Sequence, residues 1–275
     1  NRFQWCVGAY PTLAWAEKVF PDKKGGDAMD ALWDAIFSVC RITGDGRAVE
    51  RWKEHVAATA RRCSALNGYQ FKTLHYTNSL GTDLTIRLPE NHVWAGGSDR
   101  TPEGVEFVAN IPTEEVFTAP RRDGVDGRVY AALPLAMDGN LVKDFYMDFK
   151  DGRIVDVHAA EGEEILRRAI DTDEGARYLG EVALVPYDSP IRNTGILFFN
   201  TLFDENASCH LAFGEAYPSS VQGGEDMTEE EQKAAGLNRS MTHVDFMVGT
   251  ADLSVVGTTH DGKEVPVFVN GNFAF

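Results

Sequence analysis

The stretch Thr242-His243-Val244-Asp245-Phe246-Met247-Val248 contains an alternation of polar and apolar residues from His243 to Phe246, and it predicts a β-strand. Successive side chains of a strand point to opposite faces, so His243 and Asp245 would share one face, and Val244, Phe246 and Val248 the other. An unpaired buried carboxylate is costly, so Asp245 needs a cation, a metal ion or hydrogen-bond donors. Two interpretations stay open from this stretch alone: a His–Asp pair at a sheet edge, or part of a functional site.

The same period of two continues outward over most of the chain after Tyr69, for example in residues 84–88 and 252–256. Asp-Gly or Asn-Gly pairs at 123–124, 151–152, 261–262 and 270–271 indicate the turns of β-hairpins. We expect one helix, from about Glu161 to Ala169, among these strands. Residues 219–240 are expected to form an exposed loop with a short helix.

The first third of the chain has a helical pattern instead. Apolar residues spaced by three and four predict a helix from Asp27 or Asp30 to about Cys40, and another from about Ala48 to Gly68. The pattern changes from helical to strand-like near residues 65–72. The fold class predicted is therefore mixed, α/β plus α+β.

We place the domain boundary at this change of pattern. Residues 1–66 are expected to be the C-terminal portion of an α/β N-terminal domain, and residues 67–275 a β-rich domain. Residues 1–7 resemble a strand already in progress, so we expect the remainder of the first domain to precede this sequence.

Charge and composition limit the partners. The 275 residues contain 42 acidic and 26 basic residues, which gives a formal net charge of −16 at pH 7. Such a charge repels phosphate backbones and anionic lipid, and the apolar runs are far shorter than the ~20 residues of a membrane span. We expect neither nucleic acid nor membrane as a partner. Four cysteines without a C-x-x-C pair favour a reducing, cytoplasmic compartment over a disulfide scaffold.

The sequence contains none of the common nucleotide-binding, nucleophile-elbow or zincin motifs. Carboxylate and imidazole side chains in strand-like surroundings remain as candidates: Glu114 and Glu115 in 110–117, Glu181 before the apolar residues 182–185, and Glu205 and His210 in 202–211. Taken singly, each has a structural explanation, such as a capping group or a carboxylate in solvent at a strand end. Cys209 beside His210 is expected to be a small packing residue rather than a thiol nucleophile.

Two imidazoles and several carboxylates are ligands that Zn²⁺, Co²⁺ or Mn²⁺ accepts. Five or six such ligands exceed the needs of one tetrahedral zinc. They suit two ions that share a bridging carboxylate.

Four segments in order, residues 111–118, 179–185, 200–212 and 242–249, carry a family resemblance. They resemble the M29 metallopeptidases, the thermophilic aminopeptidase family, and the similarity extends over most of the chain. The resemblance implies a two-domain metallopeptidase with residues 67–275 as its catalytic, metal-binding domain. It also implies two divalent ions (Zn²⁺, Co²⁺, Mn²⁺ or Mg²⁺), peptide substrates and a homodimer.

The resemblance implies specific residues as well. The implied metal ligands are Glu115, Glu181, Glu205, His210, His243 and Asp245, with Glu181 as the bridge. The catalytic residues predicted are Glu181, Tyr217 and Glu114: the chemistry of a two-metal site suggests that Tyr217 would donate to an oxyanion and that Glu114 or Glu205 would handle a proton. A metal-binding or scaffold protein without activity, and a glycosidase built on paired Glu residues, are the alternatives.

Overall fold

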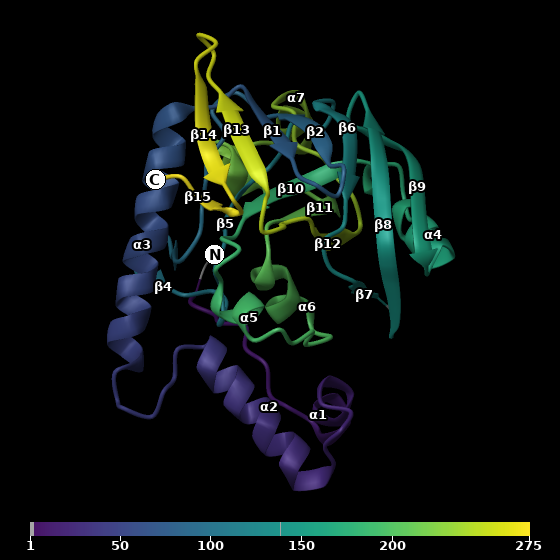
Figure 1. Ribbon diagram of the computed structural model, residues 1–275. Coiled ribbons are helices and arrows are strands. Elements are labelled where there is room, and N and C mark those ends of the chain that lie inside the picture. Colours follow the sequence, from purple (N-terminus) through teal and green to yellow (C-terminus); the bar gives the residue numbers. More distant parts are fainter. Residues whose placement is uncertain (1–2, 138) are drawn as a thin grey trace.

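The computed structural model describes residues 3–137 and 139–275. It is a mixed α/β structure whose two larger sheets are antiparallel (Figure 1). Three helices precede every strand: α1 (Leu13–Val19), α2 (Gly25–Val39) and α3 (Ala48–Tyr69). The helix predicted to begin at Asp27 or Asp30 begins earlier, at Gly25. The helix predicted to begin near Ala48 does begin at Ala48.

The expected strand at the beginning of the chain does not form over the part that the structure describes. Residues 1–2 lie outside the described residues, and residues 3–6 are irregular. Val7 makes a single parallel bridge with Asn110. One bridge without a continuous partner strand is too short to make a ladder.

The larger sheet has nine strands. Its order is β15 (Asn272–Phe273), β14 (Glu264–Val269), β13 (Ser254–Thr258), β1 (Thr73–Thr77), β2 (Asp83–Arg87), β6 (Val125–Tyr130), β8 (Asn140–Lys150) and β7 (Leu135–Met137), with β9 (Arg153–Glu161) pairing β8. The predicted Asp-Gly and Asn-Gly turns at 151–152, 261–262 and 270–271 connect consecutive strands of this sheet. The helix expected near Glu161 is α4 (Glu163–Ile170).

The smaller sheet has four strands in the order β12 (His243–Met247), β11 (His210–Gly214), β10 (Leu179–Leu184) and β5 (Val116–Thr118). One of its faces packs into the main hydrophobic core, where Phe213 and Phe246 meet residues of the nine-stranded sheet such as Phe145. Because side chains alternate along a strand, Glu181 of β10, His210 of β11, and His243 and Asp245 of β12 lie on the opposite face.

Short elements surround the smaller sheet. They are β3 (Asp99–Arg100), β4 (Glu106–Phe107), α5 (Pro190–Asn193), α6 (Thr201–Asp204) and α7 (Glu229–Ala234), with single 3₁₀ turns at Gly175–Arg177, Glu205–Ala207, Pro218–Ser220 and Gly224–Asp226. The short helix expected within residues 219–240 is α7.

A second hydrophobic core joins the N-terminal helices to the sheet region. Leu32 and Ile36 of α2 are buried together with Ile191 of α5 and Phe203 of α6. Figure 1 shows α1 and α2 below α5 and α6, with the long α3 beside the sheets. The helical residues and the loops beside the smaller sheet therefore share one packed interior. Within the described residues, no helix is both long enough and apolar enough to span a bilayer.

Candidate metal centre

The register of the four-stranded sheet collects the predicted site residues on one face. Glu181 of β10 pairs with Ala212 of β11, which pairs with Asp245 of β12. His210 lies two residues before Ala212, and His243 two residues before Asp245, so they face the same way. Glu115 directly precedes β5, the strand beside β10.

The distances between these groups are short. His210 Nε2 lies 3.1 Å from Glu115 Oε2 and 3.4 Å from Glu181 Oε1. His243 Nε2 lies 3.2 Å from Asp245 Oδ1 and 3.6 Å from Glu181 Oε2. The ligand atoms of Glu115, Glu181 and His210 all lie within 4.8 Å of one another, and so do those of Glu181, His243 and Asp245. Glu181 belongs to both groups.

Both imidazoles are held by a backbone carbonyl at the nitrogen that faces away from the carboxylates. His210 Nδ1 lies 3.1 Å from the carbonyl oxygen of Ser208, and His243 Nδ1 lies 2.8 Å from that of Glu215. An Nδ1–H that donates to a carbonyl leaves Nε2 free as a ligand, which is the usual orientation of metal-binding histidines.

Burial and the close contacts within the cluster shift the pKa values of its side chains. Burial opposes the protonated form of His210, but contacts with Glu115 and Glu181 outweigh it and raise the pKa well above its ordinary value. Burial likewise opposes protonation of His243, yet Asp245 and Glu181 raise its pKa to about 9. For Glu181 burial raises the pKa of the carboxyl, and the hydrogen bond from His210 opposes that rise.

These residues fit divalent cations. Glu115, Glu181 and Asp245 are buried carboxylates, and buried carboxylates require a compensating positive charge. Among the described residues that line the adjoining cavity, none is lysine or arginine. Carboxylate oxygen and imidazole nitrogen are the ligand types that Zn²⁺, Co²⁺ and Mn²⁺ accept.

The cluster opens into a cavity of about 640 Å³. Tyr217 lines it, with its ring 5.2 Å from that of His243 and 6.1 Å from that of Phe117. Glu205 also lines it but belongs to neither three-residue group. Burial and the neighbouring carboxylates Glu115 and Asp245 raise the pKa of Glu205 well above its ordinary value.

The catalytic role predicted for Glu114 does not agree with its position. Its carboxylate receives two hydrogen bonds from Arg41, of 2.5 and 2.7 Å, and it does not line the cavity. Glu114 binds Arg41, whereas Glu115 lies 3.1 Å from His210, so the two neighbouring side chains point to different surroundings. Of the two, Glu115 faces the cluster, and Arg41 holds the Glu114 carboxylate away from the cavity.

The stretch from His243 to Asp245 forms a His–Asp pair at a sheet edge and also belongs to the candidate site, so both interpretations of the sequence apply. β12 is an edge strand, and His243 contacts Asp245. Glu181 on β10, two strands away, also lies beside His243. The pair is therefore part of a larger polar cluster.

Several residues around the cluster carried no sequence signal. Trp5, Asp99 and Glu225 line the cavity. Glu225 stands in an acidic run that is typical of an exposed loop, and neither of the other two belongs to a recognisable motif. The sequence also does not indicate that the carbonyls of Ser208 and Glu215 contact the two histidines, because every residue has a backbone carbonyl.

Comparisons with known proteins identify the family of this chain. A family model described as thermophilic metalloprotease (M29) matches residues 1–273. Aminopeptidase AmpS of Bacillus subtilis is 50% identical over 275 residues, which are 100% of this chain and 67% of that protein. Aminopeptidase 2 of Geobacillus stearothermophilus is 48% identical over 275 residues, 100% of this chain and 66% of that protein.

A solved structure is similar over nearly the same range. Wild-type AmpT from Thermus thermophilus is 44% identical, with a TM-score of 0.89 over 97% of this chain and 64% of that chain. The chain thus spans about two thirds of the length of these relatives. Because the family model matches almost every residue, the chain belongs to the thermophilic metalloprotease (M29) family.

Proposed function

We propose that this chain carries the active site of a metal-dependent aminopeptidase, which releases N-terminal amino acids from peptides. The observation that carries the proposal is the pair of ligand groups that share Glu181. Membership of the M29 family and the names of the curated relatives support it. These names do not favour an inactive scaffold, and a glycosidase would not need the histidines.

We propose two ions. Glu115 and His210 would hold one, His243 and Asp245 the other, and Glu181 would bridge them through its two oxygens, which face different imidazoles. When bound, two such ions would supply positive charge that lowers the pKa of a nucleophilic water and favours attack on the peptide carbonyl. Glu205, the buried carboxylate outside both groups, is proposed to accept the proton or to support the ligand set from the cavity side.

Tyr217 is proposed to donate a hydrogen bond to the oxyanion. Partial burial and the carboxylates of Glu181 and Asp245 raise the pKa of its hydroxyl above the ordinary value, so the hydroxyl keeps its proton. A protonated hydroxyl beside the cluster can stabilise negative charge on the substrate.

The remaining expectations also stay proposals. Four free cysteines are consistent with a reducing, cytoplasmic compartment. The homodimer and the division into residues 1–66 and 67–275 rest on the family resemblance and on the change of sequence pattern.

The test combines metal analysis with an activity assay. The protein, prepared without chelator, is analysed by inductively coupled plasma mass spectrometry and assayed on aminoacyl reporters. We expect close to two ions per chain, loss of hydrolysis with a chelator, and recovery with added Co²⁺ or Zn²⁺. Protein that contains no metal and gains no activity from either ion would disprove the proposal.

A further inference from the structure

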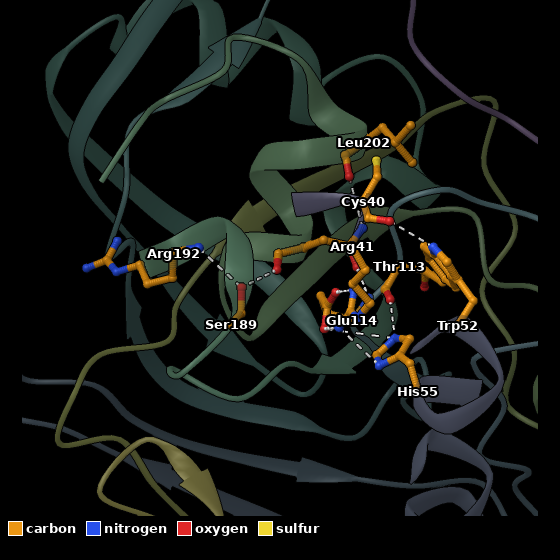
Figure 2. A network of polar contacts seen from close by, with 10 residues as sticks. Cys40, Arg41, Trp52, His55, Thr113, Glu114, Ser189, Arg192 and Leu202 are labelled. Atoms are coloured by element: carbon orange, nitrogen blue, oxygen red, sulfur yellow. Dashed lines mark hydrogen bonds and ion pairs between the residues drawn. The ribbon is translucent and has the colours of Figure 1, made fainter. Parts of the chain in front are cut away.

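The segment that presents Glu115 is held by polar contacts from two distant parts of the chain. Arg41, at the end of α2, donates to both oxygens of Glu114, at 2.5 and 2.7 Å (Figure 2). Both side chains are shielded from solvent, at 16% and 4% exposure. A bidentate pair of this kind fixes orientation as well as distance.

His55 of α3 adds a second contact. Its Nε2 lies 2.7 Å from the Thr113 carbonyl oxygen, and its Nδ1 lies 3.1 Å from the Arg41 guanidinium. Both contacts are satisfied by one tautomer, in which Nε2–H donates to the carbonyl and Nδ1 accepts from Arg41. His55 therefore connects the backbone of the segment to the cation that holds its side chain.

A third contact comes from Asn206, in the 3₁₀ turn Glu205–Ala207. The side-chain oxygen of Asn206 accepts a hydrogen bond of 2.6 Å from the Glu114 backbone N–H, and its amide donates to the Leu202 carbonyl at 3.0 Å. The segment is thus held at the Thr113 carbonyl, the Glu114 N–H and the Glu114 side chain.

Arg41 is itself held in place. It has a left-handed backbone (φ 62°) immediately after α2, and its guanidinium lies 5.4 Å from the centre of the Trp52 ring. Trp52 Nε1 donates to the Cys40 carbonyl at 2.9 Å. Residues of the N-terminal helical region are therefore arranged around Glu114, although none of them lines the cavity among the described residues.

From these contacts we infer that Arg41 and His55 are positioning residues for the metal ligand Glu115. The inference rests on the proposed function. Glu114 and Glu115 are adjacent, so holding Glu114 also holds the backbone from which Glu115 reaches His210. Without Arg41, the buried Glu114 carboxylate would lose its bidentate guanidinium partner, and the longer contact with His55 Nε2, at 3.9 Å, would not replace it, so the segment would rotate or shift toward solvent.

The test is a stepwise titration of metal-free protein with Co²⁺, followed by calorimetry and by the visible absorption of bound cobalt. In Arg41→Met we expect the binding step that uses Glu115 to weaken by about 10-fold, the lower end of the range for a lost partner of a metal ligand, because Arg41 acts through the neighbouring Glu114. The step that uses His243 and Asp245 should keep its affinity. A titration of Glu115→Gln shows which of the two binding steps uses Glu115.

A double variant separates positioning from a general loss of stability. If Arg41 acts through Glu115, Arg41→Met/Glu115→Gln should bind Co²⁺ no more weakly than Glu115→Gln alone. Arg128→Met is the control, because Arg128 also forms a bidentate pair, with Asp148 at 2.6 Å, in the nine-stranded sheet. It should leave both binding steps unchanged.

Two results would overturn the inference: both steps of Arg41→Met equal to those of the parent, or both weakened in proportion. If circular dichroism shows that Arg41→Met is not folded, Arg41→Lys replaces it. Lysine keeps the positive charge but lacks the bidentate guanidinium, so Arg41→Lys should lose less Co²⁺ affinity in the step that uses Glu115. If both binding steps of Arg41→Lys equal those of the parent, the inference is again overturned. A parent protein that binds no ion would instead remove the proposed function.

Discussion

Glu181 and Asp245 lie in one row of the four-stranded sheet, on either side of Ala212. Neighbouring strands are about 4.8 Å apart, so the two backbones are separated by about 10 Å. Their carboxylates nevertheless belong to one group of ligand atoms with His243. Ala212, which lies between them, has only a methyl group as its side chain. The space above it is therefore free for the two carboxylates to approach each other.

Ala212→Leu should therefore impair metal binding. Ala212 is fully buried, and a leucine would place a branched side chain between the two carboxylates. We expect a loss of at least one bound ion, measured by mass spectrometry of metals, with the circular dichroism of the sheet retained. Ala212→Gly, which leaves the space open, is the control and should keep both ions. Full metal content in Ala212→Leu would show that the space above Ala212 is not needed.

Glu181→Gln should reduce the metal content more than the loss of any other single ligand, because its two oxygens face different imidazoles. We expect peptidase activity at background level and a folded protein by circular dichroism. Cys209→Ser is the matched control. Cys209 is buried, its Sγ donates to the Val185 carbonyl at 3.2 Å, and burial raises the pKa of its thiol to about 12. Inactivation by the serine, with metal content unchanged, would support a thiol nucleophile instead.

Tyr217→Phe should separate catalysis from metal binding. The substitution removes only the hydroxyl proposed to face the oxyanion, and the loss of one such donor typically lowers kcat by about 10²–10³-fold. KM and metal content should stay close to those of the parent. Steady-state kinetics and metal analysis check this, and a parent-like kcat would exclude the hydroxyl from the reaction.

His92 predicts a pH dependence away from the cluster. Burial lowers the pKa of its ring, and Nε2 has no hydrogen-bond partner among the described residues. A folded-state pKa below the unfolded value means that the unfolded chain binds the extra proton first, so stability falls as pH drops through about 6.5. In metal-free protein, urea unfolding at pH 8 and pH 5.5 should show a smaller loss for His92→Gln than for the parent. Equal losses would contradict the assignment.

The sequence by itself determined the local structure and the identity of the candidate ligands. Alternation over residues 242–248 is enough to place His243 and Asp245 on one face of a strand, because the period of a strand is a local property. The helix over Ala48–Tyr69 was predictable for the same reason. The ordered segments that resemble the M29 family named six ligand candidates, and all six line one cavity.

Only the tertiary structure decided which of two adjacent glutamates faces that cavity. A shift of one residue in register exchanges the two faces of a strand, and nothing local distinguishes Glu114 from Glu115. The choice is made by Arg41, 73 residues earlier in the chain, which binds the Glu114 carboxylate. A buried carboxylate is stable only beside a compensating charge, and which charge lies beside it depends on how distant segments pack.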